Sequence, residues 1–309
     1  MILCVTPNPA VDRTARVDRV TLGAVLRPTE VIVLPGGKGI NVARAAKTLG
    51  ALVTTTGFAG GHAGRWLVEA LDADGLNPRF VPMPGETRTT YVTLDAGGRS
   101  VLVYEPGAAV SEAEVEALLA LLVTGLLASA TWAAICGSPP VGMRPDGYRA
   151  LVEASHAAGR PCLVDVGGPA LEAALAAGPD LVKVSRDEAG SALRTRSVDA
   201  ASAARSLVAR GAALAVVTDG PRGAAAADGR ATWDVEVPAI RAVDAIGSGD
   251  AFAAGLLVAL DSGRSTDEAL AFGAAAGTAN AETLGAGRFD PARQAELVDQ
   301  VRVRRRARP

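Results

Sequence analysis

Short apolar runs alternate with alanine-rich stretches along most of this 309-residue chain, and this alternation constrains the fold more than any other feature. Runs of four to eight apolar residues bounded by Gly or Pro are typical of buried strands, and the longer stretches have the length of helices. The predicted strands span residues 2–6, 52–58, 132–136, 162–166, 180–184 and 214–218. The predicted helices span residues 39–49, 64–75, 112–127, 145–158, 199–210, 249–262 and 266–280. Repeated strand-then-helix order predicts an α/β domain with a mostly parallel sheet covered by helices on both faces.

The composition limits the partners and the compartment that we expect. Hydrophobic residues make up 49% of the chain, which allows a large core, and the formal net charge of −2 gives no general attraction to nucleic acid or to an anionic membrane. Cys4, Cys136 and Cys162 lie in apolar runs without CxxC spacing. Buried free thiols of this kind suit a reducing cytosol, and the N-terminal strand does not resemble a signal peptide. We therefore expect a cytoplasmic protein.

Two other stretches need an interpretation. The Ala/Leu-rich stretch 113–135 includes Glu114 and Glu116, so we expect a water-soluble helix followed by a strand rather than a membrane span. The C-terminus carries a run of arginines, which we expect to form a frayed, solvated tail. They are Arg302, Arg304, Arg305, Arg306 and Arg308.

Two segments, about 13–34 and 86–106, break the strand-then-helix pattern within what otherwise reads as one domain, residues 1–309. Residues 89–94 and 100–105 read as strands, with Gly97 and Gly98 supplying positive-φ positions for the turn between them. Residues 13–34 read as extended chain. We interpret these segments as a small β lid, the alternative being edge strands of the main sheet. A small sheet exposes one apolar face unless it is paired, so the lid also predicts a homodimer.

The segment Asp244–Asp250, Asp-Ala-Ile-Gly-Ser-Gly-Asp, carries the strongest functional signal. Gly247 and Gly249 let the backbone approach a ligand closely, and Ser248 lies between them. The helix that begins here directs free N–H groups and the positive end of its dipole at whatever lies in front, which predicts an anion site. Asp250 can take a proton from an attacking hydroxyl, or it simply caps the helix.

A second glycine-rich segment, residues 35–44, also leads into a helix. Lys38 is suited to an anionic substrate, and Asn41 offers an amide to a sugar hydroxyl. The spacing does not match the phosphate loop GxxxxGK[ST], and an ordinary glycine turn with a solvated lysine is the alternative. Asp12, after the first strand, either binds sugar hydroxyls or is a carboxylate of a surface loop.

Two further segments follow predicted strands, where open parallel sheets usually bind ligands. Thr218-Asp-Gly-Pro-Arg-Gly223 is either a ligand-binding edge or a tight hairpin turn. Glu188 is either a surface charge on a helix or one of the carboxylates that would hold a hydrated Mg²⁺.

Other catalytic sets have little support in this sequence. His62 and His156 are the only histidines, which excludes a His-rich metal site. The chain has no GxSxG motif, as a Ser-His-Asp hydrolase would require, and Gly57–Gly61 does not match the dinucleotide pattern GxGxxG.

The paired signatures Gly-Gly-Lys-Gly-Ile-Asn (36–41) and Gly-Ser-Gly-Asp (247–250), in this order, resemble those of the ribokinase-like sugar kinases in their phosphofructokinase B branch. Within that branch the chain is most similar to 1-phosphofructokinase and tagatose-6-phosphate kinase. The resemblance extends from Thr6 to about Gly287 and implies a ribokinase-like fold. It also implies ATP-dependent transfer of phosphate to a ketohexose phosphate, such as fructose 1-phosphate or tagatose 6-phosphate. The alternatives are a kinase of an unphosphorylated sugar and a sugar-binding relative without turnover.

The resemblance also implies roles for individual residues. Asp250 would be the general base, and the amides of residues 245–249, including Gly247, Ser248 and Gly249, would form an anion hole. The sugar or its phosphate would contact Asp12, Gly37, Lys38, Asn41, Arg88 and Ser138. The nucleotide would contact Lys183, Ser185, Thr218, Gly220, Gly223 and Asn280, and Glu188 would hold Mg²⁺ through water.

The chain departs from the family pattern at a few positions. Lys183-Val-Ser185 stands where Lys-Pro-Asn is common, and Gly137-Ser-Pro-Pro140 stands where Gly-Ser-Leu-Pro is usual. Asp165-Val-Gly167 replaces Asp-Ser-Ser, and Ala245 replaces a frequent threonine. The Asp-x-x-Gly-x-Gly-Asp frame is intact, so we expect catalysis.

Overall fold

The main sheet of the molecule has ten strands, in the order β14-β13-β12-β11-β10-β9-β8-β1-β4-β5. The computed structural model describes residues 1–195 and 198–307. All six predicted strands are confirmed, as β1 (Ile2–Thr6), β4 (Val53–Ala59), β8 (Trp132–Cys136), β9 (Cys162–Asp165), β10 (Leu181–Ser185) and β11 (Leu214–Thr218). They pair in parallel, as the strand-then-helix order requires. Four strands were not predicted, β5 (Val81–Pro82), β12 (Ala224–Asp228), β13 (Ala231–Glu236) and β14 (Arg302–Ala307).

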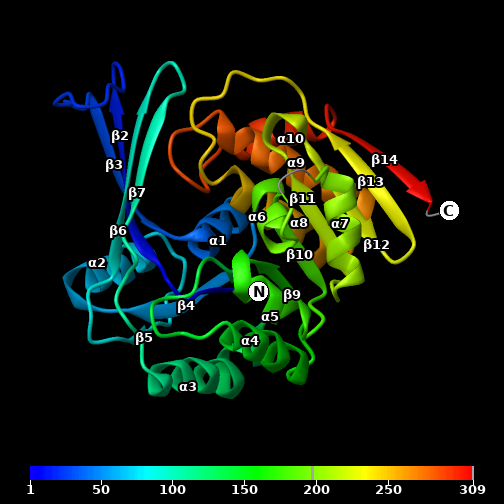
Figure 1. The fold of residues 1–309 in the computed structure, drawn as a ribbon, viewed down its shortest axis with the longest axis horizontal. Coiled ribbons are helices and arrows are strands. Elements are labelled where there is room, and N and C mark those ends of the chain that lie inside the picture. Colours follow the sequence, from blue (N-terminus) through cyan, green and yellow to red (C-terminus); the bar gives the residue numbers. More distant parts are fainter. Residues whose placement is uncertain (196–197, 308–309) are drawn as a thin grey trace.

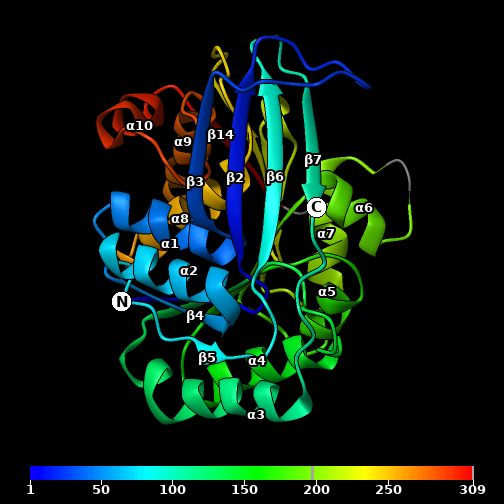
Figure 2. The same cartoon turned by 90° about the vertical axis from the view of Figure 1, so that its left-hand side faces the viewer.

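Helices cover both faces of this sheet (Figures 1 and 2). The seven predicted helices are α1 (Lys38–Thr48), α2 (Gly61–Ala73), α3 (Glu112–Leu121), α4 (Asp146–Ala157), α7 (Ala200–Ala209), α8 (Ser248–Asp261) and α9 (Thr266–Ala281). The helices α5 (Gly168–Leu175), α6 (Arg186–Ala192) and α10 (Pro291–Val298) were not predicted. Alternate strand residues enter different cores, as in β1, where Ile2 belongs to the core that includes residues of α1, α8 and α9, and Leu3 belongs to the core that includes residues of α4, α5 and α7.

The Ala/Leu-rich stretch near residue 120 is a helix followed by a strand, as predicted. A capping box between Ser111 and Glu114 starts α3, and Leu118 and Leu122 pack into the core. One π-helical and one 3₁₀ turn, Leu122–Leu126 and Leu127–Ser129, then lead into β8. Within the described residues, no helix is long and apolar enough to cross a membrane.

A separate four-stranded sheet, in the order β3-β2-β6-β7, stands beside the main body (Figure 1). Its strands are β2 (Ala10–Val17), β3 (Glu30–Gly36), β6 (Arg88–Asp95) and β7 (Ser100–Tyr104). The lid interpretation is therefore correct, and the edge-strand alternative is wrong. Of the two turn glycines, only Gly98 has a positive φ, at 78°, whereas the Gly97 amide donates to Oδ1 of Asp95 (2.9 Å).

The predicted frayed tail is wrong for residues 302–307, because they form β14, and Arg308 lies outside the described residues. This strand pairs antiparallel with β13 and completes one edge of the main sheet. Arg306 and Arg304 form ion pairs with Asp234 (2.6 Å) and Glu236 (3.2 Å), so acidic side chains on β13 meet the basic strand. Cross-strand pairs of opposite charge stabilise such a register.

Candidate active site

One cavity of about 790 Å³ lies between the lid and the main body. Its volume falls in the range of small-molecule sites. Asp12 and Arg88 reach it from the lid, and Lys38 and Asn41 reach it from the start of α1. Asp250 also lines it, so the residues of the two glycine-rich signatures face one space although they are about 210 residues apart in the chain.

The start of α8 forms one wall of this cavity. Gly247 is left-handed, at φ 79° and ψ −4°, and a Cβ there would lie 2.6 Å from Cα of Ala286, so only glycine fits. The amides of Ile246 and Ser248 are used within the turn, by Asp244 Oδ1 (3.0 Å) and by the carbonyl of Ala245 (3.2 Å). Within the described chain, the amides of Ala245, Gly247 and Gly249 have no hydrogen-bond acceptor, and all three residues line the cavity. Three of the five amides of the predicted anion hole over residues 245–249 are therefore free.

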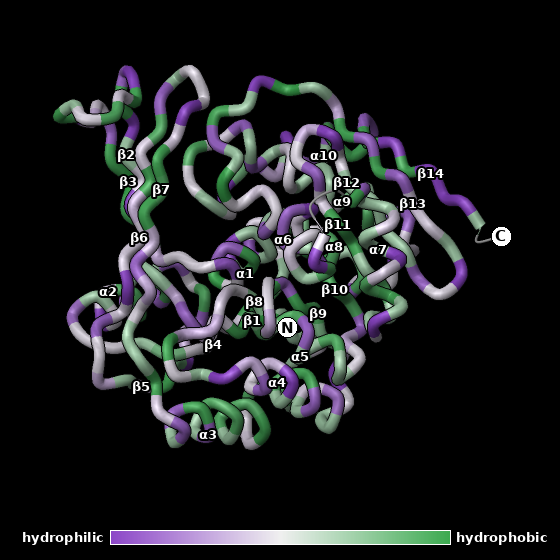
Figure 3. The backbone as a smooth tube through the Cα atoms, viewed as in Figure 1, coloured by the Kyte–Doolittle hydropathy of each residue, from purple (hydrophilic) through white to green (hydrophobic). Residues whose placement is uncertain are grey.

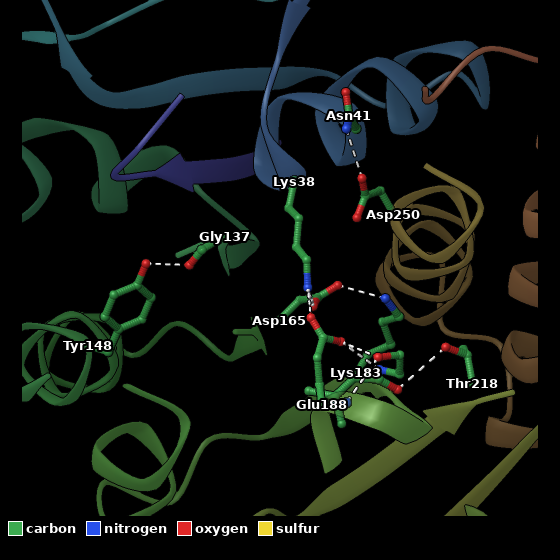
Figure 4. A network of polar contacts seen from close by, with 11 residues as sticks. Lys38, Asn41, Gly137, Tyr148, Asp165, Lys183, Glu188, Thr218 and Asp250 are labelled. Atoms are coloured by element: carbon green, nitrogen blue, oxygen red, sulfur yellow. Dashed lines mark hydrogen bonds and ion pairs between the residues drawn. The ribbon is translucent and has the colours of Figure 1, made fainter. Parts of the chain in front are cut away.

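Asp250 is the third residue of α8 and is 7% exposed. Its Oδ2 accepts a hydrogen bond from Nδ2 of Asn41 (2.8 Å; Figure 4). Burial is the main reason that the pKa of Asp250 is raised to about 6, and nearby Asp165 adds to the rise. Lys183, Lys38 and the hydrogen bond from Asn41 act in the opposite direction and lower this pKa. A carboxylate with a pKa near the working pH is suited to general-base chemistry.

Two lysines and two carboxylates form a chain of ion pairs beside Asp250 (Figure 4). Lys38 Nζ lies 2.7 Å from Asp165 and 2.5 Å from Glu188, and Lys183 Nζ lies 2.7 Å from the second oxygen of Asp165. Burial alone would lower the pKa of Lys38, but Asp165 and Glu188 outweigh it and raise this pKa. At Glu188, burial alone would raise the pKa, but Lys38 and Lys183 outweigh it and hold the pKa of this carboxylate at about 2. The shifts at Lys38 and Glu188 therefore both favour the charged forms of this pair.

Sequence reasoning noticed Asp165 only as a departure from a family pattern and gave it no role. It is completely buried at the end of β9 and accepts from both lysines. Its position after a buried strand, next to predicted ligand segments, was the available signal.

The lid contributes Asp12 and Arg88 to the other end of the cavity. Thr90 donates to Oδ1 of Asp12 (2.5 Å), and burial raises the pKa of Asp12. Arg88 donates to the carbonyls of Asn8 (3.1 Å) and Glu105 (3.3 Å). Both side chains therefore have fixed places in the cavity wall.

The far end of the cavity is formed by the segment after β11 and by apolar side chains. Thr218, Gly220 and Gly223 line it, although the same segment is also the turn of an antiparallel pair, β11 and β12. Ser185 lines it as well and caps α6, accepting from the amide of Glu188 (3.3 Å). The apolar part of this wall includes Val237, Ile240, Phe252 and Ala281.

Two predicted site residues lie elsewhere. Ser138 is exposed and does not line the cavity. Asn280 is completely buried behind the wall, where it donates to the carbonyl of Ile246 (2.9 Å) and accepts from the amide of Gly287 (2.8 Å). It holds the turn before α8 in place, so the structure does not support its predicted contact with the nucleotide.

The three cysteines are buried and free, as predicted. Their burial raises the pKa of the Cys4 and Cys162 thiols to about 12. Thiols of this kind are unreactive. They take no part in the cavity.

Comparisons with known proteins agree with this geometry. Residues 5–293 match the model of the pfkB family of carbohydrate kinases. Phosphofructokinase-2 from Escherichia coli, solved in complex with fructose-6-phosphate, is 30% identical over 97% of this chain and 98% of its own, with a TM-score of 0.86. A possible 1-phosphofructokinase from Thermotoga maritima (24% identity, 99% of each chain, TM-score 0.84) has the same fold. So does a ribokinase from that organism (19% identity, 96% of this chain and 99% of its own, TM-score 0.75). The chain belongs to the pfkB carbohydrate kinase family and is a sugar kinase, a phosphotransferase with a ribokinase-like fold.

Proposed function

We propose that this kinase transfers the γ-phosphoryl group of ATP to a hydroxyl of a ketohexose phosphate, giving a bisphosphate. The observation that carries the proposal is the shared cavity. It contains a buried carboxylate with a raised pKa, three free amides and cationic side chains at both ends.

The acceptor end of the cavity suits a phosphorylated sugar. Asp12 and Asn41 offer a carboxylate and an amide to sugar hydroxyls, and Lys38 and Arg88 are cations that suit the sugar's phosphate. The fructose-6-phosphate bound by phosphofructokinase-2 from Escherichia coli belongs to the same class of acceptor. We therefore include fructose 6-phosphate with fructose 1-phosphate and tagatose 6-phosphate among the acceptors to be tested.

The proposed mechanism is positioning combined with charge stabilisation. The acceptor hydroxyl gives its proton to Asp250 as its oxygen attacks the γ-phosphorus of ATP, the bond from that phosphorus to the β–γ bridging oxygen breaks, and ADP leaves. The amides of Gly247 and Gly249 and the ammonium of Lys183 stabilise charge on the transferred group, since Lys183 packs against Gly249. The lid covers the acceptor end and limits access of water, which suppresses hydrolysis of ATP.

The residues present fit a hydrated Mg²⁺ held through water. Glu188 lines the cavity, and its Oε1 and Oε2 already bind Lys38 and Ser185. A carboxylate in this state suits water-mediated contact better than direct ligation. When bound with the nucleotide, Mg²⁺ would neutralise charge on the β- and γ-phosphates.

A substrate screen with a coupled ADP assay tests the acceptor. We expect turnover on ketohexose phosphates to exceed turnover on the corresponding free sugars. Equal or better turnover on free sugars would show a kinase of the fructokinase or ribokinase type. In that case Arg88 would keep its hydrogen bonds to main-chain carbonyls and bind no substrate phosphate. Binding of sugar and nucleotide without any product would show a relative that has lost catalysis.

We also propose a cytoplasmic homodimer that pairs through the lid. The outer face of the lid exposes apolar side chains that the body does not cover. They are Val31, Tyr91, Val101 and Val103, which are 52%, 44%, 36% and 55% exposed. Apolar faces of this kind usually mark interfaces. The free thiols suit the cytosol.

A further inference from the structure

A buried guanidinium lies behind the catalytic carboxylate. Arg44, on α1, is only 9% exposed, and in the described part of the chain no carboxylate lies within ion-pair distance of it. Removing such a charge from water is costly, so its neighbours must compensate. Arg44 donates to Asn41 Oδ1 (3.2 Å), to the carbonyl of Ala286 (2.9 Å) and to the carbonyl of Pro35.

The contact with Asn41 determines how that amide is oriented. Arg44 and Asn41 are three residues apart on α1, which places them on one face of the helix. A guanidinium can only donate hydrogen bonds, so it requires the carbonyl oxygen of Asn41 to face it. The NH₂ group of Asn41 must then face the opposite way, toward Oδ2 of Asp250.

We infer that Arg44 is a positioning residue for phosphoryl transfer. It fixes the Asn41 amide so that this amide holds one oxygen of Asp250 and leaves the other, Oδ1, to the acceptor hydroxyl. Within the described residues, no donor is recorded for Oδ1. The inference rests on the proposed function of Asp250 as the base.

Arg44 also links the two glycine-rich signatures through the backbone. Pro35 is the next-to-last residue of β3, directly before the first signature, and Ala286 packs directly behind Gly247 in the second. A Cβ at Gly287 would lie 2.5 Å from the carbonyl oxygen of Asn41, so this turn also packs tightly on α1. One side chain thus holds α1, the lid strand β3 and the turn behind the anion site together.

The ionisation of Asp250 provides the readout. Titratable groups surround Asp250 from several elements. They are Lys38 and Arg44 on α1, Asp165 on β9 and Lys183 on β10, with Asp12 and Tyr104 across the cavity on the lid. Helix α9 packs against the start of α8 through Gly277. Of the groups near Asp250, the Asn41 amide is the one that donates directly to its carboxylate, so disturbing Arg44 should disfavour the ionised base.

The test is a double-mutant cycle of Arg44→Gln and Asn41→Ala. Each single change should lower kcat by about 10- to 100-fold, the effect of losing a hydrogen bond to a charged group. Each change should also shift the acidic limb of the plot of kcat against pH toward higher pH by about one unit. The KM for ATP should change little. In the Asn41→Ala background, Arg44→Gln should have less than about a twofold further effect, because the contact is already lost. If the two single-variant losses in kcat multiply in the double variant, the two residues act independently and the inference is overturned.

Arg160→Gln is the matched control. Arg160 also donates to two main-chain carbonyls, those of Leu127 (3.2 Å) and Ala128 (2.9 Å), but it lies outside the cavity. The Arg160→Gln variant should be less stable than the wild-type protein, but the pH profile of its kcat should not change. If Arg44→Gln does not fold, Arg44→Lys replaces it in the cycle, since an ammonium keeps the charge but not the planar fork of donors.

A second readout does not depend on turnover. In protein with ¹³C-labelled aspartate carboxyls, the Asp250 resonance is the one lost in Asp250→Asn. Arg44→Gln should raise its titration midpoint. If Arg44→Gln raises this midpoint and the wild-type protein has no kinase activity, the positioning role would be supported and the proposed function contradicted. An unchanged midpoint would overturn the inference, whatever the activity.

Discussion

Asp250 is the residue on which the proposed chemistry depends most. We predict that Asp250→Asn lowers kcat by about 10²–10⁴-fold, the usual effect of removing a general base. Binding of sugar phosphate should change little, because Asp12, Lys38 and Arg88 remain. Steady-state kinetics and calorimetric titration of the sugar phosphate check the two parts separately. Near-normal turnover would exclude Asp250 as the base.

The same residue links activity and stability in opposite directions. The pKa of Asp250 is raised from 3.8 to about 6, so the folded protein disfavours the ionised carboxylate. Turnover should therefore rise with pH through about 6. The stability cost of Asp250 grows as the pH rises from 3.8 to about 6 and is fully present above that range. We predict that Asp250→Asn stabilises the protein by about 1–3 kcal/mol at pH 8 and by almost nothing below pH 4. Urea unfolding at both pH values measures this, and a less stable variant at pH 8 would contradict it.

At the scale of elements, the cap of α6 connects a helix end to the site. Ser185 and Glu188 form a capping box, as do Ser265 and Glu268 at the start of α9. We predict that Ser185→Ala and Ser265→Ala each cost about 0.5–2 kcal/mol of stability. Only Ser185→Ala should also raise the KM for Mg-ATP, because Ser185 and Glu188 line the cavity whereas Ser265 and Glu268 do not. Equal KM values in the two variants would argue against Glu188 as the residue that holds Mg²⁺ through water.

The basic C-terminal strand protects an edge of the main sheet. We predict that truncation after Val301 leaves kcat nearly unchanged, because β14 does not line the cavity. It should expose the edge of β13 and promote self-association, which unpaired strands favour. Gel filtration and activity measurements at rising protein concentration check both parts. A monodisperse, fully stable truncation would show that β14 contributes little.

Sequence reasoning predicted most elements, and it failed where local pattern and tertiary context disagree. Apolar β-branched runs such as Leu214–Thr218 show their strand character directly. In contrast, Ala224–Asp228 has no β-branched residue, and only its place between β11 and β13 makes it a strand. Residues 302–307 likewise form a strand because the acidic β13 pairs with them. The active site followed the same rule. Its glycine-rich segments were visible, whereas Asp165 becomes meaningful only once Lys38 and Lys183 meet it.

At the scale of the whole molecule, the uncovered face of the lid predicts the oligomeric state. We expect light scattering at micromolar concentration to give about twice the chain mass of 31.2 kDa. Val101→Asp combined with Val103→Asp should shift the mass toward the monomer, since it places charge in the proposed interface. Val123→Asp, at a valine that is 58% exposed on the π-helical turn after α3, is the control and should not change the mass. A monomeric wild-type protein would remove the dimer proposal.

The lid is a sheet of its own, joined to the body at the ends of a few strands, and it supplies Asp12 and Arg88 to the cavity. The proposed base and the free amides come from the body. In the proposed mechanism, recognition of the acceptor and transfer of the phosphoryl group are thus encoded largely in different stretches of the chain. Exchanging lid strands between relatives should accordingly change which sugar is accepted while the transfer machinery stays intact, so new substrate ranges can arise in this architecture without rebuilding its chemistry.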